Sequence, residues 1–163
     1  MGYHCRTYGA GRGPRPFMLF GLAVHIINGY PTPDVKHLYD EVLRRFPEVA
    51  RYISDGDEEL PYLVVGCIAD WLLSVELDPA TMQRVVDFDR WCMEQPGGET
   101  AADDMTTIEV VALREKLFEH DKLLPIVPKL MTHEELLRNR EYLTSWVGAD
   151  RYQAALRVSR SVG

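Results

Sequence analysis

Apolar residues return every three or four positions along the first clearly patterned stretch of the chain, "TPDVKHLYDEVLRRFPEVARYI". They are Val35, Leu38, Val42, Phe46, Val49 and Ile53. This spacing places them on one face of an α-helix and predicts that the face is buried. Thr32 and Pro33 suit the N-cap and the first helical position, and Pro47 is expected to divide the segment into two helices.

The next stretch, "LPYLVVGCIADWLLSVEL" over residues 60–77, is apolar around most of its circumference. A helix of this kind is normally enclosed by others, so we expect it at the centre of a bundle. Asp78 followed by Pro79 is typical of an N-cap and a first helical residue. The pair predicts a further helix that extends to Gln95.

Three more helices are predicted in the C-terminal half. Asp103 or Asp104 can cap a helix through "MTTIEVVALREKLFEH", and Thr132 with Glu135 forms a capping box before "EELLRNREYLTSWVG". Gly148 suits the C-terminal cap of that helix, and "ADRYQAALRVSR" forms the last one. The segment "LLPIVPKL" is expected to be an extended connector, because proline disfavours helix in the residue before it.

These patterns predict an all-α fold, a compact bundle of about six helices in a single domain over residues 31–163. Residues 1–30 differ, since "MGYHCRTYGAGRGPRP" is rich in Gly, Pro and Arg and has no periodicity. We expect an irregular N-terminal extension whose short apolar run, "FMLFGLAVHII", packs on the domain. The arginines before this run imitate a secretion signal, so that alternative stays open.

The segment "VVDFDRWC" carries two aspartates inside a predicted helix. At 100° per residue, Asp89 lies near the centre of an apolar arc, whereas Asp87 and Trp91 lie on the polar side. The arc consists of Met82, Val85, Val86, Cys92 and Met93. In the following helix Arg114 lies within a second apolar arc. A buried charge requires a partner, so we predict a structural ion pair between Asp89 and Arg114, with Asp70 as a competing carboxylate.

Composition limits the classes of partner. The 163 residues carry a formal net charge of −7, and an acidic protein of this kind is not expected to bind nucleic acid or an anionic membrane. The three cysteines, Cys5, Cys67 and Cys92, have no paired spacing, which is typical of the reducing cytoplasm. No cofactor motif is present, and we expect no cofactor and no evident catalysis.

Asp103 and Asp104 are the best candidates for metal ligands, with Asp87 and Glu99 nearby in sequence. Adjacent acids before a helix more commonly act as caps and first-turn charges, so we expect no metal site. "HEELL" at His133 begins like a zinc-protease helix but has Leu137 in place of the second histidine.

Four segments, "ADWLLSVEL", "VVDFDRWCMEQ", "VVALREKLFE" and "LTSWVGADRYQAAL", resemble small bacterial helical proteins of uncharacterised families. Such proteins are similar to the immunity proteins of bacterial toxin systems, which bind and block a toxin domain. The resemblance spans about Pro33 to Val158 and implies a cytoplasmic protein-binding module of immunity or adaptor type. Trp91 and Asp87 are then the candidate partner-binding residues. The alternative is a small helical enzyme or metal-dependent regulator that uses the acids from Asp87 to Asp104.

Overall fold

The computed structural model describes residues 35–96 and 104–162, and within them the protein is all-α. The expected N-terminal extension (1–30), Thr32 and Asp103 lie outside these ranges. The helical segments are, in chain order, α1 (Val35–Arg45), η1 (Pro47–Tyr52), α2 (Pro61–Ser74), α3 (Pro79–Glu94), α4 (Met105–Glu109), η2 (Val110–Arg114), α5 (Glu115–Glu119), η3 (Leu124–Ile126), α6 (Val127–Leu130), α7 (His133–Arg138), α8 (Arg140–Val147) and α9 (Ala149–Val162).

Helix starts follow the capping residues that the sequence indicates. The Asp78 carboxylate accepts the backbone N–H of Thr81 at 2.6 Å and begins α3. Thr132 and Glu135 form the complete capping box of α7. Gly148 ends α8 with a φ of 88°, a conformation that residues with a Cβ rarely adopt. These three predictions are confirmed.

The chain is divided into more helical segments than the six expected. The predicted helix over residues 105–119 contains a π-helical turn, η2, that separates α4 from α5. The helix after Thr132 is broken at Asn139 into α7 and α8. Each break leaves the helical course of the chain intact, so the all-α class is unaffected.

The prediction that "LLPIVPKL" is extended was wrong, because this segment forms η3 and α6. Pro125 and Pro128 each lie in the first turn of one of these short helices, where a missing N–H costs no hydrogen bond. The helical turns also bury four side chains in the core, namely Leu123, Leu124, Ile126 and Val127. Burial of this apolar surface outweighs the local preference of a residue before proline.

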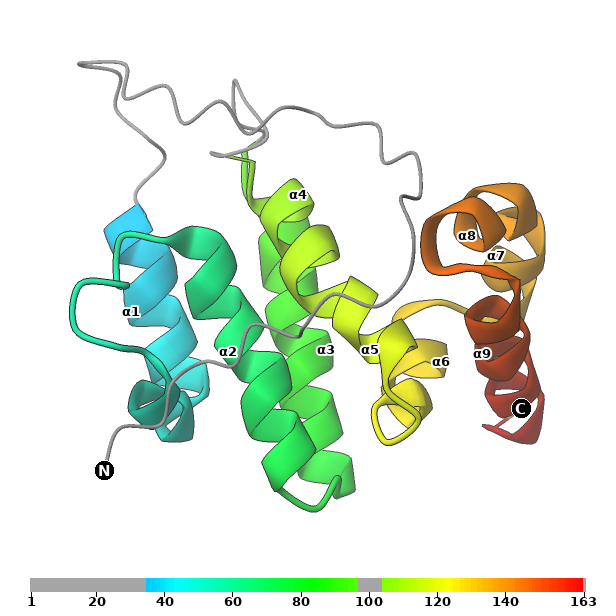
Figure 1. Ribbon diagram of the computed structural model, residues 1–163, viewed down its shortest axis with the longest axis horizontal. Coiled ribbons are helices and arrows are strands. Elements are labelled where there is room, and N and C mark those ends of the chain that lie inside the picture. Colours follow the sequence, from blue (N-terminus) through cyan, green and yellow to red (C-terminus); the bar gives the residue numbers. More distant parts are fainter. Residues whose placement is uncertain (1–34, 97–103, 163) are drawn as a thin grey trace, which may run out of the picture. The chain divides into compact units, whose positions relative to one another are not determined.

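A continuous hydrophobic core joins the segments, and α2 lies at its centre as predicted. α2 packs against α1 and η1 on one side and against α4, η2 and α5 on the other (Figure 1). α9 packs against α6, α7 and α8 in the C-terminal part of the domain. The apolar circumference of α2 is therefore explained by neighbours on most of its sides.

Arg84 on α3 connects that helix to the end of α1. Its guanidinium donates to the backbone oxygen of Arg45 through Nε at 2.9 Å, and through Nη2 to Glu48 at 2.7 Å. It also lies over the rings of Phe46 and Trp71, at 5.1 and 4.9 Å from their centroids. One side chain thus satisfies a carbonyl at the C-terminus of α1 and covers two core aromatic rings.

No helix in the described ranges has both the length and the apolar character that crossing a membrane demands.

Candidate functional site

Asp89 of α3 and Arg114 of η2 lie together, in the arrangement that the two apolar arcs predict. Nε of Arg114 donates to Oδ1 of Asp89 at 2.7 Å, and Nη2 lies within ion-pair distance of the same oxygen. Asp89 is buried, and Arg114 is largely covered. Asp70, the competing carboxylate, is exposed, and its negative charge helps to raise the pKa of Lys116.

Glu109, the last residue of α4, is a third member of this cluster and is completely buried. Its Oε2 lies 3.1 Å from Nε of Arg114. The one hydrogen on Nε is already directed at Asp89, so this close approach is not a hydrogen bond, and both Glu109 oxygens lack a donor. An ionised Glu109 would therefore be a buried charge without a donated hydrogen bond, which is costly.

This environment raises the pKa of Glu109 to about 8. Burial is the main cause, because it penalises the charged form, and the Asp89 carboxylate adds to it; Arg114 acts in the opposite direction. Glu109 is therefore mostly protonated near neutral pH. The cluster then consists of one cation, one anion and one neutral acid, and its net charge is zero.

The π-helical turn explains how Glu109 and Arg114 reach the same place. In a regular α-helix, residues five apart differ in direction by about 140°, so their side chains do not meet. The wider π turn over Val110–Arg114 brings the two side chains onto one side of the helix. The apolar spacing of residues 105–119 predicts a regular helix, in which Glu109 and Arg114 are apart, so Glu109 was not identified from the sequence. The available signal was an acid between Ile108 and Val110 inside an apolar run.

Cys92 borders the cluster on α3 and is also buried. Burial, followed by the negative charges of Glu109 and Asp89, raises the pKa of its thiol far above the ordinary value. A neutral thiol is a poor nucleophile, so Cys92 behaves as a small apolar residue here. A narrow gap beside Arg114, lined by Leu117 and Phe118 among others, offers no volume to a water molecule. The burial of Asp89 and Glu109 and the pairing of Asp89 with Arg114 are those of a structural ion pair.

Trp91 and Asp87, the candidate partner-binding residues, both have contacts within the domain. The Trp91 ring stacks on Phe88 at a centroid distance of 5.9 Å and lies 5.7 Å from the His37 ring. Trp91 is half-buried and covers the seam between α1 and α3, so it offers less open surface than an exposed anchor would. The Asp87 carboxylate accepts a hydrogen bond from Gln83 at 2.9 Å and lies 3.7 Å from Arg90.

Asp104 acts as the N-cap of α4, where its carboxylate accepts the backbone N–H of Thr107 at 2.7 Å. In the part of the chain that the structure describes, no three His, Cys, Asp or Glu side chains lie close enough to hold a metal ion together. His133 contacts Ser159, with 2.7 Å between Nδ1 and Oγ.

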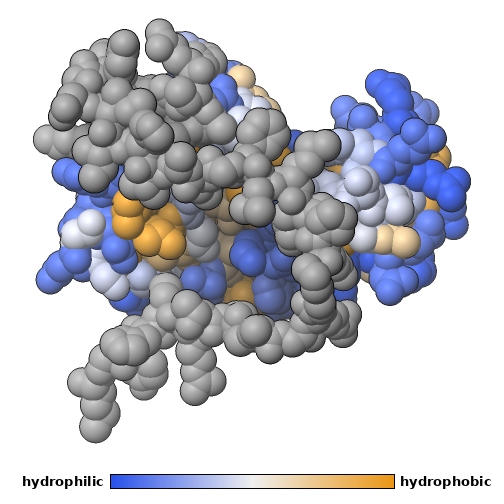
Figure 2. Space-filling model, turned by 45° about the horizontal axis from the view of Figure 1, so that its top comes forward, coloured by the Kyte–Doolittle hydropathy of each residue, from blue (hydrophilic) through white to orange (hydrophobic). Residues whose placement is uncertain are grey.

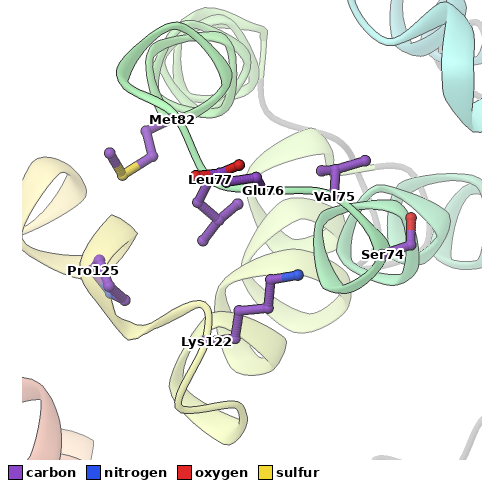
Figure 3. A pocket seen from close by; sticks show the side chains of 7 residues that line it. All are labelled: Ser74, Val75, Glu76, Leu77, Met82, Lys122 and Pro125. Carbon is purple, nitrogen blue, oxygen red and sulfur yellow. The ribbon is translucent and has the colours of Figure 1, made fainter.

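A shallow depression of about 480 Å³ lies where the end of α2 meets the start of α3 and the turn before η3 (Figure 3). Leu77, Met82 and Pro125 give it an apolar lining, and Lys122 projects beside Ser74. The Lys122 ammonium donates to the backbone oxygen of Leu73 at 2.7 Å. Lys122 therefore neutralises the carbonyl end of α2. The open shape and the engaged lysine make this depression a weak candidate for a small-molecule site.

Large apolar side chains are exposed at several helix positions, which were not identified from the sequence. They are Leu60, Leu63, Met93, Val111, Leu137 and Tyr142. Figure 2 shows one face of the molecule, on which hydrophobic side chains reach the surface between hydrophilic ones. Leu60 and Leu63 belong to the start of α2, and Val111 to η2, which packs on α2. These three therefore come from adjoining elements, whereas Leu137 and Tyr142 belong to α7 and α8.

Comparisons with protein-family models, with curated proteins and with solved structures found no match to this chain.

Proposed function

We propose that the protein is a cytoplasmic binding module for another protein, of immunity or adaptor type, and that it acts without catalysis. The observation that carries the proposal is the exposure of Leu60, Leu63 and Val111, at 46%, 47% and 43%, on adjoining elements. Exposed apolar side chains that gather on one part of a surface are typical of protein interaction sites. These residues belong to helical segments of the folded domain, so the surface is already formed in the free protein.

Three of the acids in the region of the alternative enzyme or metal regulator already have partners inside the domain. Asp87 is bound by Gln83, Asp89 by Arg114, and Asp104 caps α4. These contacts favour the binding module over the alternative. Metal analysis of the purified protein, together with Asp104→Ala, tests the alternative directly: bound metal that is lost in the variant would support it.

Isolation of the partner tests the proposal. The full chain, carrying an affinity tag and expressed in its native host, is expected to retain a specific protein that a tagged unrelated acidic protein does not retain. The identified protein is then purified, and its affinity for the chain is measured by calorimetry. Failure to recover any specific partner under native expression would contradict the binding module.

A further inference from the structure

The exposed side of α2 shows a repeating pattern that the core does not require. Leu60, at the N-cap of α2, is followed on the same helical face by Leu63, Gly66 and Asp70, at intervals of three or four residues. Leu60, Leu63 and Asp70 are exposed, and Gly66 is half-buried. We call these four residues the α2 stripe. Nearly all other side chains in the middle of α2 are buried, so the stripe is the side of the helix that its neighbours leave open.

Gly66 is unusual within this stripe. Glycine in a helix interior is less stable than alanine by about 1 kcal/mol, so it normally has a packing or backbone reason. Gly66 has an ordinary helical backbone, since Gly56 and Gly148 are the positive-φ glycines in the described residues. A Cβ atom added at Gly66 would meet no atom within 4 Å. Nothing described in the domain therefore requires glycine here, whereas close approach by an external backbone would require it.

Val111 lies on η2, the π-helical turn that packs on α2. Its side chain is 43% exposed. It therefore adds an exposed apolar residue on an element next to the stripe.

The loop before the stripe is acidic. It leads into Leu60 and contains Asp55, Asp57, Glu58 and Glu59, with no lysine or arginine between Ile53 and Leu60. Asp70, whose charge also acts on Lys116, adds a carboxylate at the far end of the stripe. The exposed side chains of Leu60 and Leu63 can pack on apolar residues of a ligand, and the acids beside them can pair with basic residues at the margins of that ligand.

We propose that the α2 stripe, with Val111, is the docking site for a basic amphipathic helix of a protein partner. The partner helix packs its apolar side on Leu60, Leu63 and Val111 and crosses α2 at Gly66, where the missing side chain lets the two backbones approach. Lysine and arginine at its margins face the acids of residues 55–59 and Asp70. This inference rests on the proposed binding function and specifies the class of partner.

A synthetic peptide of about 18 residues, with leucines on one helical face and lysines elsewhere, serves as the probe. It carries a fluorescent label, and its anisotropy is measured against the full chain at low and high salt. We expect binding that weakens with salt, and no binding of the matched peptide that has glutamate in place of lysine. Leu63→Asp is expected to weaken binding about tenfold or more.

Leu137→Asp is the matched control, because Leu137 on α7 is exposed to the same 47% as Leu63. It is expected to leave peptide binding unchanged. Gly66→Gln adds a side chain into open space, so it is expected to keep or raise the melting temperature while it weakens binding about tenfold. This variant separates loss of the site from loss of the fold.

Absence of peptide binding, or equal effects of Leu63→Asp and Leu137→Asp, would overturn the inference. Self-association of the full chain in sedimentation that Leu63→Asp abolishes would also overturn it, because the occupant would then be a second copy. If a native partner is isolated and binds the Leu63→Asp and Gly66→Gln variants like the parent, the docking site is wrong while the binding function stands.

Discussion

Replacement of Glu109 by glutamine is expected to change how the stability of the protein depends on pH. The pKa of Glu109 is about 8 in the folded protein, against 4.5 for an unperturbed glutamate side chain. Between these values the unfolded chain releases a proton that the folded protein retains. The unfolding free energy of the parent therefore falls as pH rises, by up to about 1.4 kcal/mol per pH unit from this group. Below pH 4.5 the group is protonated in both states and its contribution is fully present.

Glutamine at position 109 has nearly the same shape as the protonated acid and does not titrate. The two proteins are expected to have similar stability near pH 4.5. From pH 5.5 to pH 8.5, linkage with pKa values of 4.5 and about 8 predicts that the advantage of Glu109→Gln grows by about 3 kcal/mol. The other titratable groups are common to both proteins and cancel in the difference.

Urea denaturation of the full chain at pH 5.5, 7.0 and 8.5, followed by tryptophan fluorescence and circular dichroism, measures this difference. Glu59→Gln is the control, since Glu59 is exposed, and its difference from the parent is expected to stay constant with pH. A pH-independent difference for Glu109→Gln would refute the reasoning. It would show that Glu109 is ionised throughout and that Arg114 is paired with two carboxylates.

Three further variants test other features of the fold. Asp89→Ala is expected to lower the unfolding free energy by about 3 kcal/mol. The double variant with Glu109→Gln should be less stable than the sum of the two single effects predicts, because Glu109 would otherwise take over as the partner of Arg114. Single effects that add up to the effect of the double variant in urea denaturation would contradict this. Gly66→Ala should raise the unfolding free energy by about 0.5 to 1 kcal/mol, since its methyl group meets no atom and alanine favours helix; a lower melting temperature would be inconsistent with the open space there. Thr132→Ala removes the capping box of α7 and should cost about 1 kcal/mol in the same measurement, with Thr132→Ser close to the parent.

Local chemistry was sufficient to predict the class of fold and most helix starts. The spacing of Leu38, Val42, Phe46 and Val49 predicted one buried helical face, and all four side chains are buried. The caps at Asp78, Thr132 and Gly148 depend on a side chain or a backbone conformation within a few residues, so they can be predicted without the tertiary structure. The connector at Pro125 and Pro128 was misjudged, because local proline preferences are smaller than the burial of the apolar residues around them.

The candidate site divides in the same way. The sequence placed Asp89 and Arg114 on apolar arcs, and electrostatics then required that such charges meet. The sequence did not indicate Glu109, because residues five apart, such as Glu109 and Arg114, lie on the same side of a helix only in a π turn. The π turn η2 forms where the helix packs on other segments, and the local sequence pattern does not predict it. Met93 was assigned to the apolar arc of α3 but is exposed.

The sequence by itself therefore determined most of the helical segments, where most helices begin, and that two buried charges require each other. The tertiary structure decided which apolar residues stay uncovered. Leu63 and Val65 lie two positions apart on α2, yet Leu63 is 47% exposed and Val65 is fully buried. Their difference depends on which sides of α2 its neighbours occupy, and that arrangement is fixed by contacts between segments distant in the chain.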